Sequence, residues 1–285
     1  MDVFTLATSR KSNREFAKRE VSADKLQELK EYFASCPRLV PDIQVEMLIL
    51  GEDASEKLNA CVGYHRFLIK AFHYIVLLSD VDEHYMENAG YIGEELVLKL
   101  TEMGIETCWE TIADEPLLKK RLNLPGDKSV AAVIAFGYED AGLFARLGIK
   151  SPAEIFLKKK PGTPAPKPTI PQMFYDDEWG KAETISAMDP DDDLYKACAA
   201  VCYAPSFLNL QPCRLIHDGN KIVLAAVMDE MTNAADAKLN LGIIMMHFEG
   251  VVSRQSSGFQ GWKLEALDKD YKLPENAYLA GYYQL

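Results

Sequence analysis

The sequence predicts an α+β fold made of two tandem copies of one unit, because the same order of elements occurs twice along the chain. Each copy reads helix, loop, strand, strand, long helix and strand. The copies also end alike, in Phe136-Gly137-Tyr138 and in Ala280-Gly281-Tyr282. Between them, a run over 158–171 holds five prolines and four lysines, a composition typical of an extended linker. We therefore predict a first half over 1–157, a linker over 158–172 and a second half over 173–285.

Composition restricts the class of protein. Hydrophobic residues make up 48% of the 285 residues and charged residues 26%, which is typical of a soluble globular protein. The 43 acidic residues exceed the 31 basic ones and give a net charge of −12, which argues against a nucleic-acid partner or an anionic membrane surface. The N-terminus lacks the pattern of a signal peptide, and no apolar run approaches the roughly 20 residues of a membrane span. We expect a cytoplasmic protein.

The cysteines are expected to be reduced in that compartment. Cys198 and Cys202 are spaced to share one face of a helix. A metal pair would need further ligands, and no histidine lies close in sequence. We therefore interpret the two cysteines as small buried apolar residues, and we predict no metal.

In the first copy, apolar spacing predicts the helices and apolar runs predict the strands. A short helix covers the start of the chain, and Gly104 ends a long helix as a C-cap. Ser151 is expected to cap a short helix that begins at Pro152. The other expected elements are helices over 23–34, 54–70 and 88–103, strands over 44–50, 72–79 and 130–138, and a mostly irregular stretch after Trp109.

The second copy begins with an acidic segment, including Asp189-Pro190-Asp191-Asp192-Asp193. We interpret it as a helix cap, because a calcium-binding alternative lacks the spacing and the glycine of an EF-hand. Asp218-Gly219-Asn220 is a hairpin turn signal. The expected elements are helices over 194–203 and 234–252, the latter with His247 as a packing residue, and strands over 214–217, 221–227, 262–266 and 277–283.

A basic cluster lies near the N-terminus, where Arg10, Lys11 and Arg14 surround Ser12 and Asn13. Three cations within five residues of an acidic protein favour an anion such as a phosphate. Arginine can bind two phosphate oxygens at once, and the serine hydroxyl can add a donor. The alternative is a solvated helix face.

A polar loop over 204–212 breaks the helical pattern before it and precedes a strand. Pro205 and Pro212 fix φ and remove backbone donors. Between them, Ser206, Asn209 and Gln211 could hold the polar edge of a ligand. The alternative is an ordinary connection between a helix and a strand.

These segments are distributed unequally between the copies. The basic cluster and the segment over 104–109 occur only in the first copy, and the intact polar loop occurs only in the second. Each half thus keeps parts that the other lacks. One site shared between the halves explains this pattern.

Three segments resemble the motifs of the FMN-dependent nitroreductase family: the residues over 10–16, the residues over 104–109 and the polar loop. Members of that family are usually α+β homodimers that hold FMN at the interface with residues of both subunits. This chain resembles the tandem-duplicated, TM nitroreductase-like branch, in which one polypeptide imitates the dimer. The resemblance covers nearly the whole chain outside the linker, and it implies a monomer acting as an intramolecular pseudo-dimer.

The resemblance also assigns roles to residues. Arg10 and Ser12, with Lys11 assisting, would contact the FMN phosphate and ribityl chain, and Arg14 would approach the pyrimidine edge. Further cofactor-binding residues are Pro205, Ser206, Asn209 and Gln211 from the polar loop, Glu106 and Thr107 near the flavin N5, and Arg146 and Lys150 near the phosphate. No catalytic side chain is required, because the flavin performs the hydride chemistry.

Two departures from the family pattern stand out. Cys213 follows Gln-Pro where members often have Trp, and Glu106 stands where Gly or Ala is usual. The resemblance implies an oxidoreductase that uses NADH or NADPH to reduce a small-molecule electron acceptor, such as a nitroaromatic or a quinone. The alternatives are an FMN-binding protein without turnover, an interaction module that has lost FMN, and an enzyme acting on flavin itself or on a halogenated aromatic.

Overall fold

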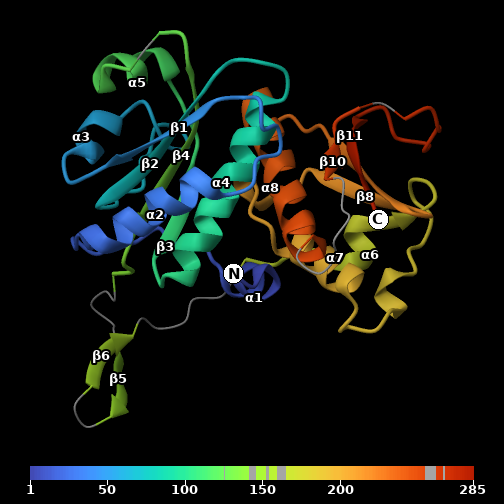
Figure 1. The fold of residues 1–285 in the computed structure, drawn as a ribbon, viewed down its shortest axis with the longest axis horizontal. Coiled ribbons are helices and arrows are strands. Elements are labelled where there is room, and N and C mark those ends of the chain that lie inside the picture. The colour runs from blue at the N-terminus through green and yellow to red at the C-terminus, as the bar shows by residue number, and fades with distance from the viewer. Residues whose placement is uncertain (125, 141–145, 152–153, 159–164, 254–260, 266) are drawn as a thin grey trace.

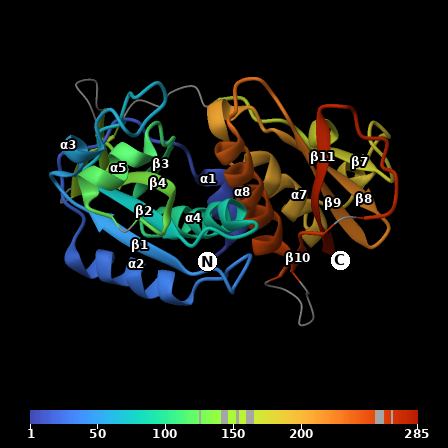
Figure 2. The ribbon, with the colours of Figure 1, turned by 90° about the horizontal axis from the view of Figure 1, so that it is seen from above.

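The structure is a computed structural model that describes residues 1–285 apart from 125, 141–145, 152–153, 159–164, 254–260 and 266. Two β-sheets lie at opposite ends of the molecule, with long helices between them (Figures 1 and 2). The helices are α1 (Val3–Ser9), α2 (Ala23–Ser35), α3 (Ala54–Leu58), α4 (Tyr85–Glu102), α5 (Glu115–Leu122), α6 (Ile170–Met173), α7 (Asp193–Tyr203) and α8 (Ala234–Val252), with 3-10 turns η1 (Ile185–Ala187) and η2 (Phe207–Asn209).

The first sheet has the strand order β1-β2-β4-β3, with every pair antiparallel. Alternate residues of β2 point to opposite faces, and both faces are covered. Ile75 and Leu77 join the core that includes α4, whereas Tyr74 and Val76 join a smaller core with α3 and α5. The strands are β1 (Val45–Leu50), β2 (His73–Ser79), β3 (Glu106–Glu110) and β4 (Ser129–Gly137).

The second sheet has the order β10-β11-β9-β8-β7, in which only the β7–β8 pair is parallel. Without β7, its order β8-β9-β11-β10 repeats the order of the first sheet. The predicted repetition of elements is therefore present in the strand pairing. The strands are β7 (Phe174–Asp176), β8 (Cys213–Asp218), β9 (Lys221–Val227), β10 (Trp262–Lys263) and β11 (Ala277–Gln284), and a separate pair joins β5 (Arg146–Ser151) to β6 (Glu154–Lys158).

Helices α4 and α8 cross at the centre of the molecule, where two glycines allow their backbones to meet (Figure 2). A Cβ added to Gly90 would lie 2.1 Å from the carbonyl oxygen of Leu239, and one added to Gly242 would lie 1.8 Å from that of Glu87. Each carbonyl belongs to the residue three positions before the opposite glycine. The contacts are thus reciprocal, as a two-fold relation between the halves requires.

A second reciprocal contact fixes the loops that follow α2 and α7. The side-chain oxygen of Asn88 accepts a hydrogen bond from the backbone N–H of Val40 at 3.0 Å, and that of Asn240 accepts one from Phe207 at 3.1 Å. Both asparagines are buried, and each lies two residues before the glycine of its helix. Each long helix therefore holds the loop of its own half.

Three local predictions were wrong. The helix expected over 54–70 ends at Leu58, because Ala60, His65 and Arg66 adopt positive φ angles that no α-helix accommodates. Within the stretch expected to be irregular, Asp114 caps α5 by accepting a hydrogen bond from Leu117 N–H.

The third error concerns the helix expected to begin at Pro152. That residue lies outside the described part of the chain, and 154–158 form strand β6. Extended pairing with β5 replaces the predicted helix. The late strand expected over 262–266 is also shorter, because only Trp262 and Lys263 pair with β11.

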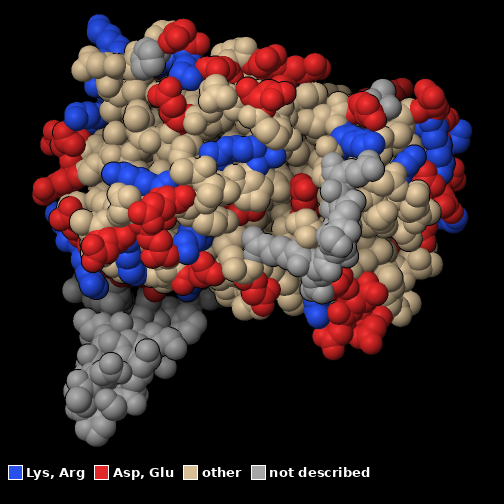
Figure 3. All heavy atoms as spheres, in the orientation of Figure 1, with Lys and Arg blue, Asp and Glu red and all other residues tan. Residues whose placement is uncertain are grey.

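Acidic and basic side chains are interspersed over the face shown in Figure 3. Cys198 and Cys202 are both buried in the core that runs through both halves. Among the described residues, no cluster of three or more His, Cys, Asp or Glu side chains is arranged to hold a metal. Within the same residues, no helix has both the length and the apolar character needed to cross a bilayer.

Candidate functional site

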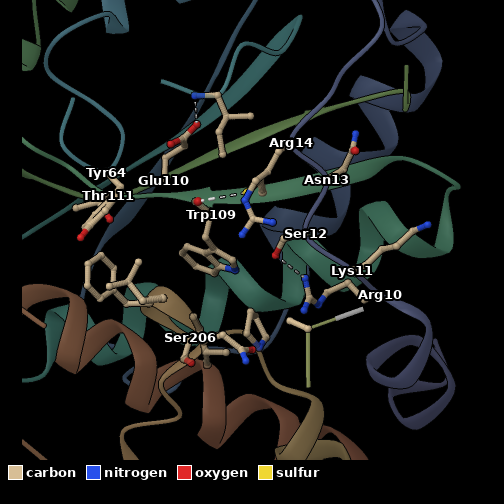
Figure 4. A pocket seen from close by; sticks show the side chains of 18 of the residues that line it. Arg10, Lys11, Ser12, Asn13, Arg14, Tyr64, Trp109, Glu110, Thr111 and Ser206 are labelled. Atoms are coloured by element: carbon tan, nitrogen blue, oxygen red, sulfur yellow. Dashed lines mark hydrogen bonds between the residues drawn. The ribbon is translucent and has the colours of Figure 1, made fainter. Parts of the chain in front are cut away.

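A cavity of about 1350 Å³ opens between the two halves (Figure 4). Residues from the first half, the second half and the segment that connects them all line it. Its wall includes residues 10–15, Tyr64, Phe67, Ile69, residues 108–111, residues 165–167, Tyr203, residues 205–209, Asp236, Leu239, Asn240 and Ile243. Its size is at the upper end for small-molecule and cofactor sites.

The basic cluster forms one side of this cavity. Helix α1 ends at Ser9, and Arg10 already has extended backbone angles (φ −63°, ψ 139°). The segment then runs beside β3, where Ser12 pairs with Thr107 and the Asn13 N–H donates to the Thr107 oxygen at 2.9 Å. Figure 4 shows the Arg10, Ser12 and Arg14 side chains on the same side of the cavity. The alternative of a solvated helix face is therefore wrong.

The polar loop forms the facing side, with Ser206 opposite the basic segment in Figure 4. Leu208, Asn209 and Gln211 all have positive φ angles of 45–58°, which cost about 1–3 kcal/mol each for residues other than glycine. The loop is held by a hydrogen bond of 3.0 Å from the Gln211 N–H to the Ser206 hydroxyl, and by the bond from Phe207 to α8. Such strain persists where the surrounding structure fixes it, often at ligand sites.

Two cations meet at the inner end of the site. The Arg10 side chain is 5% exposed, and its Nε atom is buried without a hydrogen-bond partner, 3.9 Å from the Glu94 carboxylate. The Lys167 ammonium donates to the Ala204 oxygen at 2.9 Å and to the Asn209 side-chain oxygen at 2.8 Å. Burial lowers the pKa of Lys167 to about 8, and the Arg10 charge lowers it further.

The Glu94 carboxylate organises the wall between the halves. Glu94 and His247 are fully buried and lie 2.8 Å apart, so His247 links α8 to α4 as well as packing in the core. The other Glu94 oxygen accepts a hydrogen bond of 2.9 Å from the indole N–H of Trp109. One carboxylate therefore orients the Trp109 ring, which lines the cavity, and faces Arg10.

Aromatic side chains line the outer part of the cavity. The rings of Tyr64 and Phe207 meet edge to face at 5.7 Å between their centroids, and they join the two halves. Phe67, also in the lining, is 81% exposed. These residues come from the turns that replace the second part of the predicted helix over 54–70.

Most of the predicted site residues come together. Seven of them line the cavity: Arg10, Lys11, Ser12, Arg14, Pro205, Ser206 and Asn209. Gln211 is buried behind the loop that it supports.

The other predicted residues lie elsewhere. Glu106 and Thr107 precede the part of the strand that lines the cavity, which is 108–111, so the predicted contacts with the flavin N5 are not supported there. Arg146 and Lys150 lie on β5. Their side chains are outside the described part of the chain, so their phosphate contacts stay predictions.

Several lining residues were missed by sequence reasoning. Lys167 lay within the run interpreted as a linker, and its single lysine between prolines was the available signal. Trp109 stood at the end of a quoted motif without an assigned role. The aromatic residues Tyr64 and Phe67 were hidden by the incorrect helix prediction, and Asn240 by the apolar helix around it.

Glu110 is an acid in the cavity wall that should make stability depend on pH. Burial raises the pKa of its carboxyl to about 8, although the Ile69 N–H, 2.9 Å away, and Arg14 oppose this. The unfolded carboxyl has a pKa of about 4.3. The folded state thus binds the extra proton, and native stability should fall as pH rises from about 4.3 to 8.

Glu110→Gln should remove this loss. We expect its free energy of unfolding to exceed that of the native protein by about 2–4 kcal/mol at pH 8, with no excess near pH 4, because each pKa unit is worth about 1.4 kcal/mol. Urea titrations at both pH values measure the difference. The exposed control Glu52→Gln should show none, and a pH-independent effect of Glu110→Gln would contradict the assignment.

Comparison with known proteins gives one family match. Residues 2–251 match the model of a family described as "Putative TM nitroreductase". No curated protein matches the sequence.

Solved structures share the fold. A "putative nitroreductase" from Thermotoga maritima has a TM-score of 0.53 at 15% identity, and the match covers 99% of this chain and 92% of that one. A "Putative NADH dehydrogenase/NAD(P)H nitroreductase" from Parabacteroides distasonis has a TM-score of 0.47 at 20% identity, over 61% of this chain and 96% of that one. An FMN-dependent nitroreductase from Clostridium difficile has a TM-score of 0.42 at 24% identity, over 47% and 86%.

Proposed function

We propose an oxidoreductase function from one premise: this chain belongs to the TM nitroreductase family. The proposed activity is reduction of a small electron-poor acceptor, such as a nitroaromatic or a quinone, with NADH or NADPH as electron donor and FMN as the bound cofactor. One chain would act alone, its two halves taking the places of the two subunits of a dimer.

The observation that carries the proposal is the pair of buried cations at one end of a cavity between the halves. Arg10 has a buried donor without a hydrogen-bond partner, and Lys167 lies within range of its charge. Buried charges require compensation, and the phosphate of FMN would supply it. The cavity is also large enough for a flat three-ring system, with Trp109 and the polar loop on its walls.

The residues of this chain have distinct parts in the proposal. Arg10 and Ser12 would bind the phosphate and the sugar chain. Arg14 would place a positive charge at the polar edge of the ring system, where it favours an anionic form. The fixed loop around Ser206 would cover one side of the ring and exclude water. When bound, FMN supplies the hydride transfer itself.

The visible absorbance spectrum of the purified protein tests the function. We expect a yellow protein that anaerobic NADH or NADPH bleaches, which would establish a flavin oxidoreductase and identify its donor. A yellow protein that neither nucleotide bleaches would favour the alternative, an FMN-binding protein without turnover. A colourless protein that cannot be loaded with FMN would reject both.

We also expect one FMN per chain. The basic cluster occurs only in the first half, and the corresponding region of the second half, 176–188, carries no such cluster. The flavin absorbance of the loaded protein, divided by its polypeptide concentration, measures the ratio. Two flavins per chain would refute the single site.

A further inference from the structure

We propose that the segment connecting the halves is part of the cofactor site, and that the ammonium group of Lys167 binds the cofactor phosphate beside Arg10. This inference rests on the proposed function, and it extends the site to a segment whose sequence indicates only a spacer. It makes Lys167 a binding residue rather than part of a passive connection.

The position of Lys167 is fixed by both halves. Its ammonium donates to the Ala204 oxygen at 2.9 Å and to the Asn209 side-chain oxygen at 2.8 Å. An ammonium has three N–H donors, so these two bonds leave one for a ligand. Because Lys167 also lines the cavity, that donor can serve a molecule bound there.

The connecting segment is itself attached to the polar loop. The Asn209 side-chain N–H donates to the Pro166 oxygen at 3.0 Å, so Asn209 contacts two successive residues of the segment. Pro166 and Pro168 restrict the backbone on either side of Lys167. The ammonium is therefore held in place before a ligand arrives, which reduces the entropy lost on binding.

The charges around Lys167 leave its position short of negative charge. Three titratable groups act on it: Arg10, Glu94 and Cys202. Glu94 already contacts His247, Trp109 and Arg10. Burial raises the pKa of the Cys202 thiol to about 12, so this group is neutral at pH 7.

The two cations thus share a single nearby carboxylate. An anion between them would relieve their repulsion, and a phosphate with two negative charges fits this requirement better than a neutral group.

Comparison of FMN with riboflavin isolates the phosphate, because riboflavin has the same rings and sugar chain without it. The quenching of flavin fluorescence, titrated with the apoprotein, gives the Kd of each ligand. At pH 7 we expect Lys167→Met to raise the Kd for FMN at least tenfold and the Kd for riboflavin less than twofold. Lys30→Met, which removes an exposed charge on α2 outside the cavity lining, should change neither.

The pH dependence gives a second readout. The free Lys167 ammonium has a pKa of about 8, and bound phosphate would raise it, so the Kd of native protein for FMN should increase between pH 7 and pH 9. Lys167→Arg should bind FMN about as well as native protein at pH 7 and lose most of this increase, because its guanidinium stays charged. Riboflavin binding should be independent of pH in this range.

Several results would overturn the proposal. An equal loss of FMN and riboflavin affinity in Lys167→Met would show that Lys167 only supports the loop. Unchanged FMN affinity in that variant would also reject it. If native protein binds riboflavin and FMN equally, the phosphate has no site, although a flavin function could stand. If it binds neither flavin, the proposed function fails and this inference fails with it.

Discussion

Replacing both Arg10 and Ser12 with alanine is expected to weaken FMN binding by about 2–5 kcal/mol. The Arg10 side chain is 5% exposed and has an unused donor at Nε, so a phosphate there would form a charge-assisted bond away from water. Ser12 lies 3.5 Å from the Arg10 guanidinium and can add a hydroxyl donor. Fluorescence titration of the double variant measures the loss, about 30-fold to several thousand-fold in Kd.

A matched control keeps the change in composition and moves it outside the cavity. Ser9→Ala combined with Lys18→Ala also removes one hydroxyl and one cation from the N-terminal segment, and neither residue lines the cavity. This control should bind FMN within about twofold of native protein. If the Arg10 and Ser12 double variant retains native affinity, the phosphate does not bind at the basic cluster.

Gly242→Ala is expected to destabilise the protein by about 3 kcal/mol, near the upper end for overpacking. The new methyl group would lie 1.8 Å from the carbonyl oxygen of Glu87. Because this neighbour is backbone, only separation of α4 and α8 can relieve the clash. The greater helix propensity of alanine, worth about 1 kcal/mol, offsets little of the loss. The midpoint of urea unfolding measures the change.

The same helix offers a control for propensity. A Cβ at Gly250 would contact only side-chain atoms of Val3 and Met246, at 3.1–3.4 Å. Gly250→Ala should therefore remain within about 1 kcal/mol of native stability. Equal stability of the Gly242 and Gly250 variants would mean that the helices can separate at the crossing without loss.

The larger elements could be predicted because their signals are local and periodic. The apolar spacing along α4 and α8 and the turn between β8 and β9 all lie within short windows of sequence. The two-copy arrangement followed from the order of these elements, and the strand pairing repeats it. The predicted site residues of the basic cluster and of the polar loop came together for the same reason.

The errors arose where distant contacts decide the local structure. The sequence over 59–70 has helical composition, yet it turns so that Tyr64 can meet Phe207 of the second half. Lys167 stands in a segment without apolar periodicity. Its position depends on the Ala204 oxygen and on Asn209, which are 37 and 42 residues away. No window of sequence contains such a contact.

The covalent path between the halves has a consequence for dilution. The cavity needs Arg10 from one half and Ser206 from the other, and both belong to one polypeptide. Association of the halves is therefore intramolecular, with an effective concentration set by the connecting chain rather than by the amount of protein. A two-subunit site would dissociate at low concentration, whereas this one should stay assembled. Its ligand affinity and its thermal midpoint should not change when the protein is diluted.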